Sequence, residues 1–187
     1  MKKPGYDFTC DFVTSHEKVW NECLTRFKGH PCKALEVGSH EGRSAIWFLE
    51  NILDHPSSRL TCIDPWAWNP DYERRFKSNI EASGLSEKCL ALKGYSANIL
   101  PSLTQKVDFA YIDGAKDADQ FLMNAVLVWL NLTKGGLILF DDYGWTFKEN
   151  KDLHRKPPQV GIDAFLDAYE GLYEVIHKGW QVVIQKL

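Results

Sequence analysis

Several features that define other classes of protein are missing from this chain of 187 residues. No apolar run approaches the roughly 20 residues that a membrane-spanning helix needs, so we expect no membrane partner. No block of Lys and Arg is present, and the net charge of −3 argues against nucleic acid as the main partner. The N-terminus has charge but no apolar stretch behind it, so we expect no secretory signal and a cytoplasmic location.

Paired cysteine motifs and sequence repeats are missing as well. The five cysteines form an odd set without a C-x-x-C pair, and no segment is repeated or of low complexity. Cys23, Cys62 and Cys89 lie within apolar patterns, which is typical of reduced thiols in a protein core. Since 44% of the residues are hydrophobic, the chain can build one sizeable core, and we expect a single domain over residues 1–187.

What the chain does contain is an apolar run that ends in a glycine loop. Residues 34–37 form the run, Gly38 and Gly42 follow four positions apart, and a helical apolar pattern begins after them. This order predicts a buried strand, a tight loop and a helix, the first unit of a nucleotide-binding α/β sheet. Ser39 and His40 stand between the glycines, so the loop lacks the G-x-G-x-x-G pattern of a dinucleotide-binding oxidoreductase.

An acid precedes the glycine loop. Glu36 lies two residues before the first glycine, and a carboxylate there suits a cationic ligand better than a pyrophosphate. S-adenosylmethionine, which carries an amino group and a sulfonium, is such a ligand. The glycines let the backbone approach it closely, and the helix start presents free N–H groups.

Strand and helix patterns alternate along the rest of the chain. They predict an α/β fold: a Rossmann-like three-layer sandwich with a mostly parallel seven-stranded sheet that ends in an antiparallel β-hairpin. Residues 1–30 are expected to form an N-terminal helical extension. The expected strands cover residues 34–37, 60–63, 90–92, 107–112, 137–140, 173–176 and 181–184. Further helices are expected over residues 71–82, 97–103 and 119–132.

A polar stretch over residues 143–160 departs from this alternation. It holds four Lys and Arg residues and the pair Pro157-Pro158. A loop of that length favours a functional role, so we expect an active-site loop in which Trp145 and His154 shape a pocket. A solvated connector is the alternative.

Carboxylates follow most of the predicted strands. Ligands in open α/β sheets bind at the carboxyl ends of the strands, so these acids mark the expected site. Asp64, after the second strand, is placed to accept the hydroxyls of a ribose, and capping of the next helix is the alternative. Ser96, after the third strand, either meets an adenine edge or caps the helix that follows.

Three more acids end two neighbouring strands. Asp113, Asp141 and Asp142 are expected about 5 Å apart, where they would repel one another without a positive charge between them. A hard divalent cation, Mg²⁺ by default or else Mn²⁺ or Ca²⁺, would meet this need. Lys116 is a second source of positive charge and a candidate general base, because burial and a metal both lower a lysine pKa. The alternative is a surface lysine paired with Asp117 or Asp119.

Taken together, these residues resemble class I S-adenosylmethionine-dependent methyltransferases, over about residues 34–187. The run from Leu35 to Ala45, then Asp64, then residues 94–96 carry the resemblance. Asp113-x-x-Lys116 followed by Asp141-Asp142 resembles the signature of metal-dependent O-methyltransferases of the catechol and caffeoyl-CoA type. Two positions depart from the patterns: the catechol-type pair is Asp-Asn, and a closer group of small bacterial-type methyltransferases has histidine at position 116.

The resemblance implies O-methylation of a small-molecule hydroxyl, with Lys116 and Asp113 catalytic and a metal held by Asp113, Asp141 and Asp142. It also implies a set of S-adenosylmethionine-binding residues: Glu36, Gly38, Ser39, Gly42, Ser44, Asp64, Pro65, Trp66, Gly94, Tyr95, Ser96 and Asp113. A homodimer is the default oligomer. The alternatives are a metal-independent small-molecule methyltransferase and a catalytically silent module that binds the cofactor.

Overall fold

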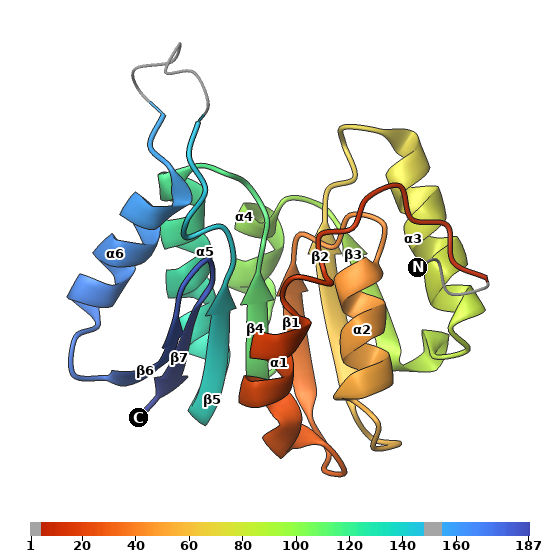
Figure 1. Ribbon diagram of the computed structural model, residues 1–187, viewed down its shortest axis with the longest axis horizontal. Coiled ribbons are helices and arrows are strands. Elements are labelled where there is room, and N and C mark those ends of the chain that lie inside the picture. Colours follow the sequence, from red (N-terminus) through yellow and green to blue (C-terminus); the bar gives the residue numbers. More distant parts are fainter. Residues whose placement is uncertain (1–4, 148–154) are drawn as a thin grey trace. The chain divides into compact units, whose positions relative to one another are not determined.

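The computed structural model describes residues 5–147 and 155–187. It has the predicted α/β architecture, with seven strands in the order β3-β2-β1-β4-β5-β7-β6 (Figure 1). The chain divides into two compact units, Met1–Tyr95 and Ser96–Leu187, and each is described by itself.

The first unit contains three parallel strands in the order β3-β2-β1. They are β1 (Lys33–Val37), β2 (Arg59–Asp64) and β3 (Cys89–Lys93). Its helices are α1 (Glu17–Leu24), η1 (Thr25–Phe27), α2 (Arg43–Asn51), α3 (Pro70–Ala82) and η2 (Ser86–Lys88). Residues 5–16 precede the first helix and run as turns and bends, so only the second half of the expected N-terminal extension is helical.

Local sequence explains why these helices form where they do. On α2 every side chain from Ala45 to Leu49 is buried, so the helix is covered on more than the one face that an apolar stripe predicts. At the start of α3 the Asn69 side chain accepts a hydrogen bond from the N–H of Asp71, with Pro70 at the first helical position.

The second unit contains β4 (Val107–Ile112) parallel to β5 (Leu132–Phe140), followed by an antiparallel pair. The pair is β6 (Tyr173–Lys178) and β7 (Val182–Lys186), and β7 lies next to β5. The helices are α4 (Ser96–Ile99), η3 (Leu100–Ser102), α5 (Ala118–Asn131) and α6 (Pro158–Ala168). Figure 1 shows α5 and α6 side by side, and the Trp129 ring of α5 contacts Phe165 of α6 at 5.7 Å between centroids. The antiparallel pairing of β6 with β7 confirms the predicted closing hairpin.

Several predicted boundaries are wrong. The fifth strand begins at Leu132, because Gly135 adopts a left-handed φ of 76° inside the strand and shifts its register instead of ending it. The last helix begins at Pro158, inside the expected loop, because proline suits a first helical turn. Residues 148–154 of that loop, including His154, lie outside the described residues.

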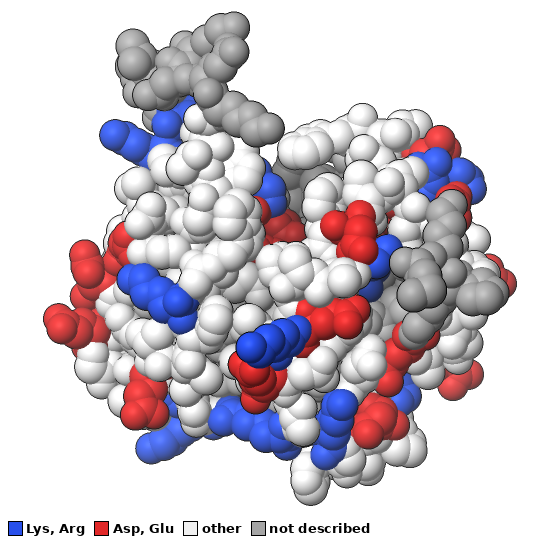
Figure 2. All heavy atoms as spheres, in the orientation of Figure 1, with Lys and Arg blue, Asp and Glu red and all other residues white. Residues whose placement is uncertain are grey.

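The surface carries both signs of charge. On the face drawn in Figure 2, acidic and basic side chains are interspersed, without an area of one sign that spreads over several elements. Within the described ranges, no helix combines the length and apolar character needed to cross a membrane. The five cysteines are free thiols, but Cys89 lies on strand β3 with its side chain half-buried, not in the core.

Candidate active site

The glycine loop of residues 38–42 connects β1 to α2. The N–H of Gly38 donates to the carbonyl of Ile63 at 2.8 Å, which continues the pairing of β1 with β2. Gly42 has a φ of 84°, and a Cβ there would lie 3.0 Å from the Phe76 ring. Only glycine meets both conditions, so the sequence folds the loop tightly at this point.

Asp64, at the end of β2, fixes the backbone of this loop. Its Oδ2 accepts the N–H groups of Ser39 and His40, both at 2.9 Å. Its Oδ1 accepts the N–H of Trp66 at 2.6 Å. A carboxylate has about four acceptor positions, so these contacts leave room for about one more hydrogen bond. Asp64 therefore organises the loop in addition to its predicted part in holding a ribose.

Trp66 and His40 lock each other in strained conformations. Both have left-handed φ values, 45° for Trp66 and 46° for His40. The indole Nε1 of Trp66 donates to the His40 carbonyl at 2.7 Å, and the ring packs against Phe76. With 5% of its surface exposed, Trp66 supports the loop from inside rather than presenting an open face to a cofactor.

Glu36, at the penultimate position of β1, is a fully buried carboxylic acid. Its Oε1 accepts the Ser44 hydroxyl at 2.5 Å. Its Oε2 and the Ser39 hydroxyl are also buried, and neither makes a hydrogen bond within the described residues. Burial raises the pKa of Glu36 from 4.5 to about 7, against the opposing influence of Ser39, Ser44 and Cys62. Two unsatisfied polar atoms at the glycine loop suit a ligand ammonium group.

The other residues predicted to bind the cofactor lie in two places. The N–H of Gly94 donates to the carbonyl of Asp64 at 3.0 Å, so the end of β3 adjoins the end of β2. Tyr95 follows it with 60% of its surface exposed. Ser96 begins α4 and, like Asp113, belongs to the second unit.

In the second unit, the predicted acids and lysine do come together. Strands β4 and β5 pair in register at Ile112 and Phe140, so Asp113 and Asp141 follow at neighbouring strand ends. The ammonium group of Lys116 lies 2.7 Å from Oδ1 of Asp113 and also contacts Oδ2 of Asp142. Lys116 therefore occupies the place between the carboxylates where the sequence also allowed a metal ion.

Burial and the charges of this cluster shift the pKa values of Asp113 and Lys116. Burial raises the pKa of Asp113 well above its ordinary value, opposed by Lys116 and reinforced by Asp141 and Asp142. Burial alone would lower the pKa of Lys116, but Asp113 and Asp142 outweigh it and raise that pKa. The expected lowering of the lysine pKa is thus wrong, because ion pairing exceeds the effect of burial.

A divalent cation at these acids would have to displace the Lys116 ammonium group. Oxygen ligands of the right kind are present, but Asp113 and Asp142 already bind the Lys116 ammonium group. Nowhere in residues 5–147 and 155–187 are three or more His, Cys, Asp or Glu side chains grouped as a metal site.

Tyr111 is a member of the cluster that the sequence analysis did not select. This buried residue of β4 donates its hydroxyl to Asp141 and lies 3.3 Å from Oδ2 of Asp113. Strand periodicity contained the signal, since residues two apart share one face of a strand and Tyr111 precedes Asp113 by two.

The chain on either side of residues 148–154 is tied to this region of the second unit. Arg155 binds Asp117 through two hydrogen bonds, of 2.7 and 2.8 Å. The hydroxyl of Tyr143 donates to Asp163 of α6 at 2.9 Å. From the sequence alone, Asp117 is an alternative partner of Lys116. In the structure Asp117 pairs with Arg155, and Lys116 pairs with Asp113 and Asp142.

Comparison with known proteins adds independent information. Residues 35–143 match a family model described as a methyltransferase domain. Catechol O-methyltransferase from Bos taurus is 30% identical over 144 residues, which cover 68% of this chain and 50% of the bovine protein. Catechol O-methyltransferase from Sus scrofa is 29% identical over 118 residues, 60% of each chain. The chain thus spans between half and 60% of the length of these two relatives.

Solved structures share the fold of this chain. An O-methyltransferase from Bacillus cereus in complex with SAH gives a TM-score of 0.73 at 18% identity, over 96% of this chain and 84% of that one. The O-methyltransferase TomG from Streptomyces achromogenes, in complex with SAM, gives 0.72 at 18% identity, over 94% and 81%. At such identities the likeness shows the fold alone, and it confirms the predicted Rossmann-like class.

Proposed function

Because residues 35–143 match the methyltransferase-domain family, this chain belongs to that family, and we propose that it methylates a hydroxyl group of a small molecule with S-adenosylmethionine as donor. The observation that carries the proposal is the pair of buried, unsatisfied polar atoms at the glycine loop, Oε2 of Glu36 and Oγ of Ser39. A buried carboxyl oxygen that makes no hydrogen bond is costly, and an ammonium group of the ligand would offset that cost.

The first unit supplies the cofactor contacts in this proposal. Glu36 and Ser39 bind the amino group of the methionine part, and Gly38 and Gly42 let the backbone approach it. Asp64 uses its remaining acceptor capacity for a ribose hydroxyl while it holds the loop. Pro65, Gly94, Tyr95 and Ser96 remain predicted contacts of the nucleoside.

The second unit supplies the groups that handle the proton. The substrate oxygen attacks the methyl carbon in line, the bond from carbon to sulfur breaks, and the hydroxyl proton passes to the Asp113 carboxylate, which the Lys116 ammonium group holds in place. Tyr111 and Asp142 hold that pair in place through the contacts described above. Much of the acceleration comes from alignment of the two reactants.

Assistance by a divalent metal is the second candidate for this chemistry. The acids Asp113, Asp141 and Asp142 favour it by ligand type, whereas Lys116 in its present position opposes it. A metal would stabilise the deprotonated substrate oxygen, and Lys116 would have to leave the acids first.

The similarity to the bovine and porcine enzymes guides the choice of substrate. Their names specify catechol, so we propose hydroxylated aromatic compounds as the first acceptors to test. Aromatic acceptors would also suit the described part of the expected active-site loop, where Trp145 and Phe147 lie with ring centroids 4.6 Å apart.

A calorimetric titration of S-adenosylmethionine, with and without Mg²⁺, tests the proposal on the wild type and on Asp141→Ala. We expect both proteins to bind the cofactor, because the proposed cofactor contacts do not include Asp141. A Mg²⁺ heat that Asp141→Ala abolishes would favour the metal-assisted candidate. Methylation of a catechol acceptor that survives a chelator would favour proton transfer by the Asp113–Lys116 pair. Absence of cofactor binding in the wild type would overturn the proposed function.

A further inference from the structure

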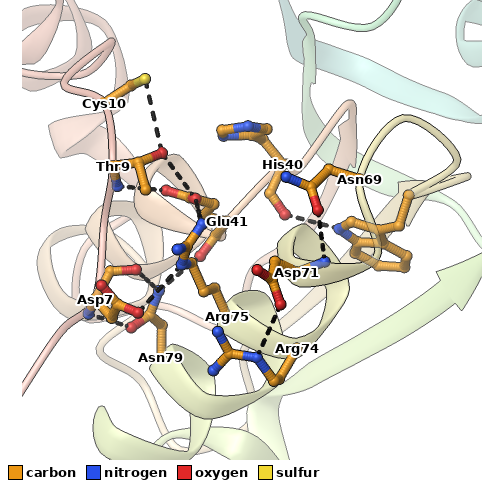
Figure 3. Close-up of polar contacts among 11 residues, drawn as sticks. Asp7, Thr9, Cys10, His40, Glu41, Asn69, Asp71, Arg74, Arg75 and Asn79 are labelled. Carbon is orange, nitrogen blue, oxygen red and sulfur yellow. Dashed lines mark hydrogen bonds and ion pairs between the residues drawn. The ribbon is translucent and has the colours of Figure 1, made fainter.

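Residues 5–14, here called the N-terminal segment, are fixed to the glycine loop through Glu41. The Glu41 side chain is 2% exposed and lies directly before Gly42. Its Oε2 accepts the backbone N–H of Thr9 at 2.7 Å, and its Oε1 accepts the Thr9 hydroxyl at 2.8 Å (Figure 3). A loop carboxylate is thus used to hold a piece of chain more than thirty residues away in sequence.

Two residues of α3 complete this contact. Arg75 donates to Oε1 of Glu41 at 3.0 Å and to Oδ2 of Asp7 at 3.1 Å. The Asn79 side chain, 1% exposed, accepts the N–H of Asp7 at 2.7 Å and donates to the carbonyls of Asp7 and Glu41. Figure 3 shows these side chains converging between the segment and the helix. Both carboxylate oxygens of Glu41 and both amide atoms of Asn79 are paired in this network, which favours one geometry.

The first residue of α2 adds a separate contact on the other side of Gly42. Arg43 binds Asp11 at 2.7 Å and lies over the Phe8 ring at 5.4 Å from its centroid. Both neighbours of Gly42 are therefore engaged by the N-terminal segment. Residues 5–14 lie outside the matched range 35–143, so nothing in the family match accounts for them.

We propose that the N-terminal segment is a clamp on the glycine loop and that Glu41 is the positioning residue through which it acts on cofactor affinity. The inference rests on the proposed function, because it assigns a role toward the same cofactor. Loop residue His40, next to Glu41, holds a left-handed φ of 46°, which persists only when its surroundings enforce it. The segment is part of those surroundings.

Linkage makes the proposal reciprocal. If docking of the segment favours the loop geometry that binds the cofactor, cofactor binding must favour docking of the segment to the same extent. The backbone N–H groups of Asp7 and Thr9 report on docking, because their acceptors are Asn79 and Glu41. If Glu41 had a purely structural role, addition of the cofactor product SAH would leave the hydrogen exchange of these two N–H groups unchanged.

The test combines hydrogen exchange with calorimetry, using SAH as the probe. In the wild type, SAH should slow exchange at Asp7 and Thr9 about fivefold or more. Glu41→Gln should weaken SAH binding about tenfold and remove the effect of SAH on exchange. The double variant Asp7→Ala/Thr9→Val alters only the segment and leaves the loop and core intact, so it should weaken SAH binding in the same direction even if Glu41→Gln folds poorly.

Glu73→Gln is the matched control, since Glu73 lies on α3 near Arg75 but pairs with Lys77 and Lys93. It should leave SAH affinity within about twofold of the wild type, as surface ion pairs contribute little. SAH binding that is unchanged in both Glu41→Gln and the double variant would overturn the clamp and leave the proposed function standing. A wild type that does not bind SAH would overturn both.

Discussion

At the scale of single residues, similar acids have different tasks here. Glu36 is buried with one oxygen unsatisfied, which favours its neutral form. Asp64 accepts hydrogen bonds from backbone N–H groups of the glycine loop, and Glu41 accepts a hydrogen bond from the N-terminal segment. Spacing in the sequence located Glu36 and Asp64 near the predicted site, but the task of each acid depends on partners that spacing does not reveal.

The Glu36 pKa predicts a specific pH dependence of stability in the ligand-free protein. Because the folded-state pKa is raised from 4.5 to about 7, the folded protein binds a proton that the unfolded chain has released between these values. Stability should therefore fall as pH rises from about 4.5 to 7, by about 3 kcal/mol in total.

Urea unfolding of wild type and Glu36→Gln at pH 5 and pH 8 measures this contribution. Other titrating groups, Asp113 among them, are common to both proteins, so the difference between the two isolates Glu36. The variant should be the more stable protein at pH 8 and should bind SAH more weakly. An equal loss of stability between the two pH values in both proteins would contradict a buried acid at position 36.

At the scale of elements, the contact of α5 with α6 is set by a glycine. A Cβ on Gly161 would lie 2.0 Å from the carbonyl oxygen of Ala118, the first residue of α5. The N–H of Ala118 in turn donates to the carbonyl of Lys156, just before α6. The two helices approach this closely only because position 161 has no side chain.

Gly161→Ala should therefore destabilise the protein, against the preference of an isolated helix. Helix propensity alone would favour alanine by about 1 kcal/mol. The steric conflict should reverse the sign and lower the free energy of unfolding by about 1–3 kcal/mol. Chemical denaturation decides the sign directly. Ala164→Gly, an exposed exchange on the same helix, is the control and should cost only the propensity difference of about 1 kcal/mol.

At the scale of the whole molecule, the sequence divides the candidate chemistry between the two units. The buried acid and the glycine loop belong to Met1–Tyr95, whereas Asp113, Lys116 and the acid pair belong to Ser96–Leu187. Cofactor affinity and the rate of methyl transfer should therefore respond to different substitutions.

Lys116→Gln should leave the Kd for SAH within about twofold of the wild type and lower kcat/KM for a catechol acceptor by about a hundredfold or more. The reason is that Lys116 contacts Asp113 and Asp142 and takes part in proton transfer, not in the contacts proposed for the cofactor. Lys106→Gln removes only an exposed bond to the Leu130 carbonyl and should change neither quantity. A parallel loss of SAH affinity in Lys116→Gln would contradict this separation.

The sequence predicted the strand pattern well because that pattern depends on local order. Alternating apolar runs located the strands, and the rule that ligands meet strand ends selected Asp64 and Asp113 as candidates. What local order could not supply was pairing across distance. Tyr111 donates its hydroxyl to Asp141, which lies thirty residues away, and the polar N-terminal segment has no periodicity to mark its contacts with Glu41. Strand boundaries are limited in the same way. Glycine ends some strands and bends others, so Gly135 alone does not show where β5 begins.

In the part of the chain that the structure describes, three non-glycine residues with left-handed φ follow the ends of strands: His40, Trp66 and Asp142. Glycine would adopt these conformations with less strain, by an amount on the order of 1 kcal/mol per position. In a directed-evolution experiment that rewards heat resistance alone, the codons of His40 and Asp142 should drift toward glycine or asparagine, whereas Trp66 should persist because its buried ring packs against Phe76. Under selection for growth that depends on turnover, the same codons should resist that drift. The residues found at these positions would then show whether selection has acted more on thermal stability or on catalytic turnover.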